Sequence, residues 1–198
     1  MDTVLDRMLL GVVGPTIGFL LGLFADHIRR LIFRPRVRAQ YGQGPDYISE
    51  TIKGEESYTY VRGIIKNTSL TTARECRVYL TRIDKWDSQV NGYKRRDFRD
   101  SLRLRWSAVP EGERTAAITL PKGITQAFDI FRASTADSGQ LHVQASMVPS
   151  RYLPIFAEPG QFRLTIQVVT ENYAHQTSTV TIQWGGTWNS LSYISSRT

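Results

Sequence analysis

The chain has 198 residues, of which 41% are apolar and 22% are charged, so it is long enough for one sizeable core and global disorder is excluded. A single cysteine, Cys76, excludes an intramolecular disulfide. The formal net charge of +7 comes from two basic stretches, one at the N-terminal end and one at residues 93–106.

The first element is the apolar segment 8–25, MLLGVVGPTIGFLLGLFA, which contains no charged residue. A helix of this length spans ~27 Å at ~1.5 Å per residue, close to the ~30 Å hydrocarbon core of a bilayer. A cleaved secretory signal is disfavoured by the acidic leader MDTVLDR. A buried core helix is disfavoured because Thr16 is the only polar side chain in the segment. The pattern favours a single transmembrane helix within an N-terminal domain at residues 1–34.

Basic residues follow this segment rather than precede it. Only Arg7 stands before it, whereas the juxtamembrane set after it is Arg29, Arg30, Arg34, Arg36 and Arg38. The positive-inside rule therefore predicts an inner (plasma) membrane protein with its N-terminus outside and the rest of the chain in the cytoplasm. These arginines are expected to contact the headgroups of the lipid bilayer.

Glycines recur at every fourth position of the apolar segment, at Gly14, Gly18 and Gly22. This spacing places them on one helix face, where a second helix can approach closely, so it predicts a homo-oligomer through helix packing. Simple tolerance of glycine in a spanning helix explains the spacing equally well.

Beyond Pro35 the apolar residues alternate with polar ones, which is typical of strands. The expected strands are 37–41, 58–66, 76–83, 102–106, 128–131, 141–147, 162–168 and 180–184. About eight strands with one apolar face each predict a mainly β fold, an antiparallel immunoglobulin-like β-sandwich over residues 35–187. A closed barrel remains an alternative. Residues 188–198 are expected to form a frayed C-terminal tail.

The stretch YVRGIIKNTSLTTARECRVYLTRI, residues 60–83, resembles the strand-turn-strand core of bacterial CARDB-like (cell-adhesion-related) immunoglobulin-like modules. Ser69 stands where that pattern has glycine. The segments LRLRWS and QWGGTW are similar to ones in uncharacterised prokaryotic proteins that join a membrane helix to such a sandwich. The resemblance implies a binding or scaffolding module without catalytic residues.

Motifs that carry chemistry are absent from the sequence. The histidines, at positions 27, 142 and 175, have no partner at metal-ligand spacing, and there is no GxxxxGK[ST] loop or GxSxG motif. We therefore expect no catalytic residue, no metal and no cofactor. The glycosylation sequon Asn67-Thr68-Ser69 is interpreted as a turn.

The second basic stretch, residues 93–106, leaves the remainder of the β domain neutral. Its basic residues are Lys94, Arg95, Arg96, Arg99, Arg103 and Arg105. They are expected to form a solvated strand face, or else to contact anionic lipid, or to hold an anionic ligand such as a nucleotide or nucleic acid. In the last case Tyr93, Phe98 and Trp106 would supply rings for stacking. Lipid is favoured over nucleic acid, because a nucleic-acid binder usually has a broader basic surface.

Together these patterns predict a non-enzymatic, single-pass membrane-anchored binding or scaffolding protein, whose cytoplasmic β-sandwich recognises a protein partner or an anionic ligand. The alternative is an oligomerising membrane effector, in which the sandwich senses an anionic ligand and the glycine-faced helices perforate the membrane.

Overall fold

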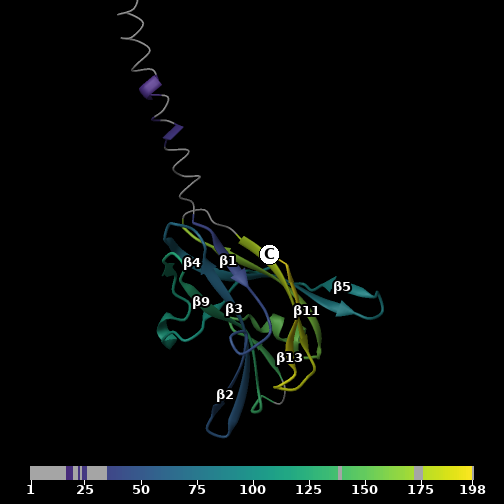
Figure 1. The fold of residues 1–198 in the computed structure, drawn as a ribbon. Helices are drawn as coiled ribbons and strands as arrows, with labels where there is room; N and C mark the ends of the chain where they lie inside the picture. The colour runs from purple at the N-terminus through teal and green to yellow at the C-terminus, as the bar shows by residue number, and fades with distance from the viewer. Residues whose placement is uncertain are drawn as a thin grey trace, which may run out of the picture. The chain divides into compact units, whose positions relative to one another are not determined.

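The computed structural model describes residues 17–19, 22, 24–25, 35–137, 140–171 and 176–197. The chain divides into two compact units, Met1–Arg34 and Pro35–Thr198. All of the strands among the described residues lie in the second unit (Figure 1).

In the first unit, helical backbone is found at residues 17–19, 22 and 24–25, and most of the predicted span 8–25, Gly14 included, lies outside the described residues. Within the part of the chain that the structure describes, no helix is long and apolar enough to cross a membrane. On this finding the prediction of a transmembrane helix is wrong. The fold class is mainly β, without the predicted N-terminal span. The prediction relied on lipid to offset the helix cost of three glycines, at about 1 kcal/mol each, and of a proline at about 3 kcal/mol.

The second unit consists of two antiparallel sheets, as expected from the alternating pattern (Figure 1). The first sheet contains β1 (Val37–Gln40), β2 (Ile48–Lys53), β3 (Glu56–Asn67), β7 (Arg105–Trp106), β9 (Thr125–Ser134) and β10 (Leu141–Val143). The second contains β4 (Ala73–Asp87), β5 (Gly92–Arg95), β6 (Leu102–Arg103), β8 (Ile118–Leu120), β11 (Gly160–Val169), β12 (Gln176–Trp184) and β13 (Leu191–Arg197). Two short 3-10 helices, η1 (Glu111–Glu113) and η2 (Ser150–Phe156), lie in the connections.

Most of the strands bury an apolar face in one core between the sheets, whereas β2 and β5 contain no buried residue. In β4 the alternation of Cys76, Val78 and Leu80 is buried as predicted. The core also includes the rings of Phe128 and Trp106, both at most 1% exposed. Large aromatic side chains bury the most apolar area per residue and so contribute much of the stability of such a core.

The predicted strand 102–106 is divided in the structure. Residues Leu102–Arg103 form β6 on β4 of the second sheet, whereas Arg105–Trp106 form β7 on β9 of the first. Between them Leu104, 1% exposed, makes an isolated bridge to Ala145. The LRLRW alternation therefore marks a crossing from one sheet to the other, which a period of two does not distinguish from one straight strand.

The C-terminal segment also differs from the expectation. Residues Leu191–Arg197, predicted to fray, form β13 along β12 at the edge of the second sheet. Leu191 and Tyr193 are each 5% exposed, so this strand contributes to the core. The alternation LSY is too short to stand out in the sequence, and backbone pairing with β12 supplies the order.

Cys76 is fully buried, and burial raises the pKa of its thiol to about 11. Because the thiolate is the reactive form, we expect this thiol to be unreactive in the native state. Native protein at pH 8 should react with a disulfide reagent such as DTNB at least ~100-fold more slowly than protein in denaturant. Equal rates would contradict the burial.

Candidate functional site

The outward face of the second sheet carries two rows of polar side chains that run across its strands. The first row consists of one residue from each of β4, β11, β12 and β13, in that order: Asp84, Arg163, Thr181 and Ser195. The second row consists of Arg82, Thr165, Thr179 and Arg197 on the same four strands. They alternate with buried residues such as Ile83, Leu164 and Val180. Since side chains on a strand point alternately to the two faces, both rows project away from the core.

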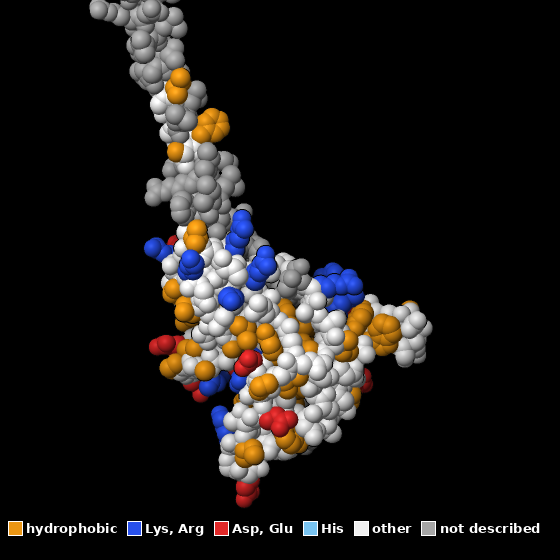
Figure 2. All heavy atoms as spheres, in the orientation of Figure 1, with side chains coloured by type: hydrophobic (Ala, Val, Ile, Leu, Met, Phe, Trp, Pro, Cys, Tyr) orange, Lys and Arg blue, Asp and Glu red, His pale blue; other side chains and the backbone are white. Residues whose placement is uncertain are grey.

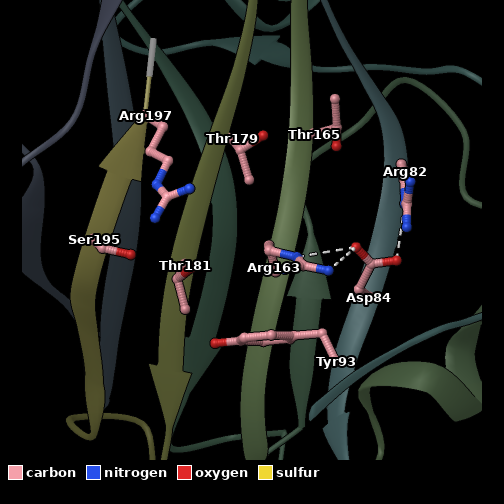
Figure 3. Close-up of a pocket in the computed structure, with 9 residues that line it drawn as sticks. All are labelled: Arg82, Asp84, Tyr93, Arg163, Thr165, Thr179, Thr181, Ser195 and Arg197. Carbon is pink, nitrogen blue, oxygen red and sulfur yellow. Dashed lines mark hydrogen bonds and ion pairs between the residues drawn. The ribbon is translucent and has the colours of Figure 1, made fainter.

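Asp84 organises one end of these rows. Its side chain is 3% exposed; Oδ1 accepts a hydrogen bond from Arg82 Nε at 2.9 Å, and Oδ2 accepts one from Arg163 Nε at 3.1 Å. A terminal nitrogen of Arg163 also lies 3.1 Å from Oδ2 (Figure 3). The side chains of Arg82 and Arg163 remain 45% and 37% exposed. Asp84 thus fixes two guanidinium groups while both still face solvent.

The Tyr93 ring supports Arg163 from the other side. The guanidinium carbon of Arg163 lies 4.3 Å from the ring centroid, and Figure 3 shows the two groups one above the other. Tyr93 is held in turn by a T-shaped contact with Trp86, in which the ring centroids are 5.1 Å apart, and by a 3.1 Å hydrogen bond from its hydroxyl to Gln161 Oε1. Stacked and ion-paired, Arg163 loses little further conformational freedom when it binds a ligand.

Together these residues line a hollow of ≈ 380 Å³ on the sheet face. The lining residues are Arg82, Asp84, Tyr93, Arg163, Thr165, Thr179, Thr181, Ser195 and Arg197 (Figure 3). Register shifts lie on both sides of it, after Thr165 between β11 and β4 and after Thr181 between β12 and β13. Such bulges increase strand twist locally and are common beside binding sites.

The chemistry of this hollow is that of an anion site. The lining contains three arginines and one carboxylate, and the remaining lining side chains carry hydroxyl groups. A guanidinium has five N–H donors in a planar fork, so Arg82 and Arg163 keep donors that Asp84 does not take. Within the described ranges no group of three His, Cys, Asp or Glu side chains could hold a metal ion.

The basic residues predicted from the sequence are placed elsewhere and do not gather. Lys94 and Arg95 lie exposed on β5, and Arg99 forms an exposed ion pair with Asp97 at 2.8 Å. Arg96 follows β5, and Arg103 and Arg105 are separated on β6 and β7 of different sheets. Only Arg95 is near the hollow by register, opposite Asp84.

Two of the three aromatics proposed for stacking are unavailable. Phe98 and Trp106 are each 1% exposed, and the indole of Trp106 donates to Ala116 O at 2.7 Å. Tyr93 is the member that reaches a site.

Of the arginines in the hollow, Arg163 occupies a polar position of the predicted alternation, which is a signal of exposure but not of proximity. Arg82 has the parity of the buried Val78 and Leu80, and it faces outward because the register between β4 and β11 shifts between Leu80 and Arg82. Arg197 lies in the segment that was predicted to be a tail.

The predicted juxtamembrane arginines are distributed as follows: Arg36 and Arg38 are exposed near the start of the β unit, and Arg29, Arg30 and Arg34 lie outside the described residues. Gly18 and Gly22 have helical backbone, and a methyl group added at either meets nothing within 4 Å. No contact in the described chain therefore tests their predicted role in helix packing.

A serine, an aspartate and a histidine also meet near the end of β9. Asp137 Oδ2 accepts from Ser134 Oγ at 2.8 Å and lies 3.0 Å from Arg132 and 3.2 Å from His142 Nε2. Burial raises the pKa of Asp137, but the Ser134 hydrogen bond and the charges of His142 and Arg132 outweigh this and lower it. Because the serine donates to the carboxylate and not to the histidine, the arrangement lacks the base-to-nucleophile contact of a hydrolase.

Comparisons with known proteins add no functional information. No protein-family model and no curated protein matches the chain. A solved structure described as "X-ray structure of Northeast Structural Genomics Consortium target SoR45" is 12% identical, with 85% of this chain and 86% of that chain covered and a TM-score of 0.27. A likeness this weak supports no conclusion, and the resemblance to CARDB-like modules stays a prediction.

Proposed function

We propose that this protein is a binding module that recognises an anionic group, such as a phosphate, in the hollow on the outer face of its second sheet. The observation that carries the proposal is Arg163, held between the Asp84 carboxylate and the Tyr93 ring with more than a third of its side chain exposed. A pre-positioned guanidinium is well suited to bidentate contact with phosphate or carboxylate oxygens.

Removing this guanidinium should weaken anion binding. We expect Arg163→Ala to lower the affinity of the full chain for pyrophosphate by at least about tenfold, since a charge-assisted hydrogen bond contributes about 1.5–3 kcal/mol. Arg163→Lys should recover only part of the loss, because the ammonium keeps the charge but not the planar fork. Isothermal titration calorimetry at low salt measures both.

The matched control is Arg99→Ala, which removes the same charge from the exposed ion pair with Asp97 in the 93–106 stretch. The affinity of this variant for pyrophosphate should stay within about twofold of that of the unsubstituted protein, because an exposed charge outside the site acts only through screened, long-range attraction. An equal loss in Arg99→Ala and Arg163→Ala would instead assign anion binding to general surface charge and contradict the proposal.

A protein partner is the second candidate, and one observation favours it. The hairpin of β4 and β5 projects from the sandwich (Figure 1), and hydrophobic side chains gather on it (Figure 2). Trp86 is 37% exposed and Val90 is 68% exposed, next to the exposed Lys94 and Arg95. Tryptophan and arginine are enriched in the binding hot spots near the centres of protein interfaces. Absence of any anion binding in the calorimetry would favour this alternative.

A further inference from the structure

The hollow has two basic ends rather than one. At the β4–β11 end, Arg82 and Arg163 share Asp84. At the β13 end, Arg197 projects into the same hollow (Figure 3), and no described carboxylate forms an ion pair with it. Arg163 and Arg197 are two strands and two residues apart in register. Strand spacings of ~4.8 Å and rises of ~3.4 Å per residue place their Cα atoms about 12 Å apart.

Hydroxyl groups cover the sheet between these two ends. Thr165, Thr179, Thr181 and Ser195 are the lining residues that lie between the basic ends. Threonine and serine hydroxyls both donate and accept hydrogen bonds, so this floor suits a ligand with hydroxyl groups better than an apolar one. A volume of ≈ 380 Å³ is within the range of small-molecule sites, about 300–1,000 Å³.

We propose that the hollow binds a small ligand with two phosphate groups joined by a hydroxyl-bearing spacer, as in a sugar bisphosphate. One phosphate contacts Arg163 and Arg82, the spacer lies over Thr179 and Thr181, and the second phosphate contacts Arg197. This inference rests on the proposed anion-binding function and adds the second subsite and the spacer. It assigns Arg197 to the second phosphate alone.

Three probes separate the subsites: fructose 6-phosphate, fructose 1,6-bisphosphate and 1,6-hexanediol bisphosphate, each titrated into the full chain by calorimetry. The sugar bisphosphate should bind at least about tenfold more tightly than the monophosphate, which corresponds to one added phosphate contact. It should also bind more tightly than the hexanediol compound, whose spacer has no hydroxyl group. Equal binding of the two bisphosphates would overturn the role of the spacer.

The deciding variant is Arg197→Ala, with Arg99→Ala as its charge-matched control. Arg197→Ala should bring the affinity for fructose 1,6-bisphosphate down to within about twofold of the affinity of the same variant for fructose 6-phosphate. Arg99→Ala should keep the ratio of these two affinities that the unsubstituted protein has. A gain that survives in Arg197→Ala would overturn the second subsite. If fructose 6-phosphate still binds, and Arg163→Ala weakens that binding, the loss of the second subsite leaves the proposed anion-binding function standing. Failure of these three probes and of pyrophosphate to bind would overturn both proposals.

Discussion

Asn67→Ala should destabilise the domain by about 3 kcal/mol, because it removes a fully buried amide from a hydrogen-bond network. Asn67 is 0% exposed; its Nδ2 donates to Thr71 O at 2.7 Å and to Leu120 O at 2.8 Å, and its Oδ1 accepts from Ser69 N and Oγ. The amide therefore joins the turn after β3 to β8. Urea denaturation followed by tryptophan fluorescence measures the change in the free energy of unfolding.

Thr68→Ala is the control in the same turn. Thr68 is exposed, and its hydroxyl donates only to Arg36 O at 3.1 Å, so its loss should change the free energy of unfolding by no more than about 0.5 kcal/mol. A similarly small effect of Asn67→Ala would show that the network does not stabilise the turn. The sequon Asn67-Thr68-Ser69 is thus a structural turn, and its asparagine is inaccessible in the folded domain.

The second large effect is expected at Gly63, in the middle of β3. Gly63 is paired with Phe128 on β9, and a Cβ added at Gly63 would lie 2.2 Å from Cζ of that ring. The Phe128 ring is fully buried, and its centroid lies 6.3 Å from that of Tyr41 and 6.5 Å from that of Trp106, with both rings nearly perpendicular to it, so it can move aside only by displacing these neighbours. Gly63→Ala should therefore cost about 2–3 kcal/mol through overpacking.

A double-mutant cycle tests this cause directly. In a Phe128→Leu background the ring is gone, so the added methyl group of Gly63→Ala should cost at least about 1 kcal/mol less than in the unsubstituted protein. Chemical denaturation of the four proteins gives the coupling energy. Additive effects of the two substitutions would mean that the ring contact is not the reason for glycine at this position.

The alternating pattern predicted the fold as far as local sequence can. Strand β11 has a continuous apolar face and was found where the pattern placed it. Strand β4 was also found there, but its alternation shifts after Leu80, so that Ile83 and not Arg82 faces the core. The short strands β2, β5 and β8 were not predicted, because three to six residues contain too few alternations to recognise. Their order comes from pairing with β3 and β4, which is tertiary information.

The candidate site was harder to predict than the fold. The sequence draws attention to the basic residues that are close along the chain, between Lys94 and Arg105, but these residues separate onto different strands. The hollow instead joins Arg82, Arg163 and Arg197, which are more than 30 residues apart and meet only through the register of β4, β11, β12 and β13. One-residue changes of register would turn these side chains toward the core.

The central claim, that the outer face of the second sheet binds anions, is tested most directly by amide chemical shifts of the full chain titrated with pyrophosphate. We predict that the largest saturable shifts occur in three segments around the hollow, residues 82–84, 163–165 and 179–181, and that they are absent in Arg163→Ala. Larger shifts in residues 94–105 or at the tip of the β4–β5 hairpin than in these three segments would contradict the claim.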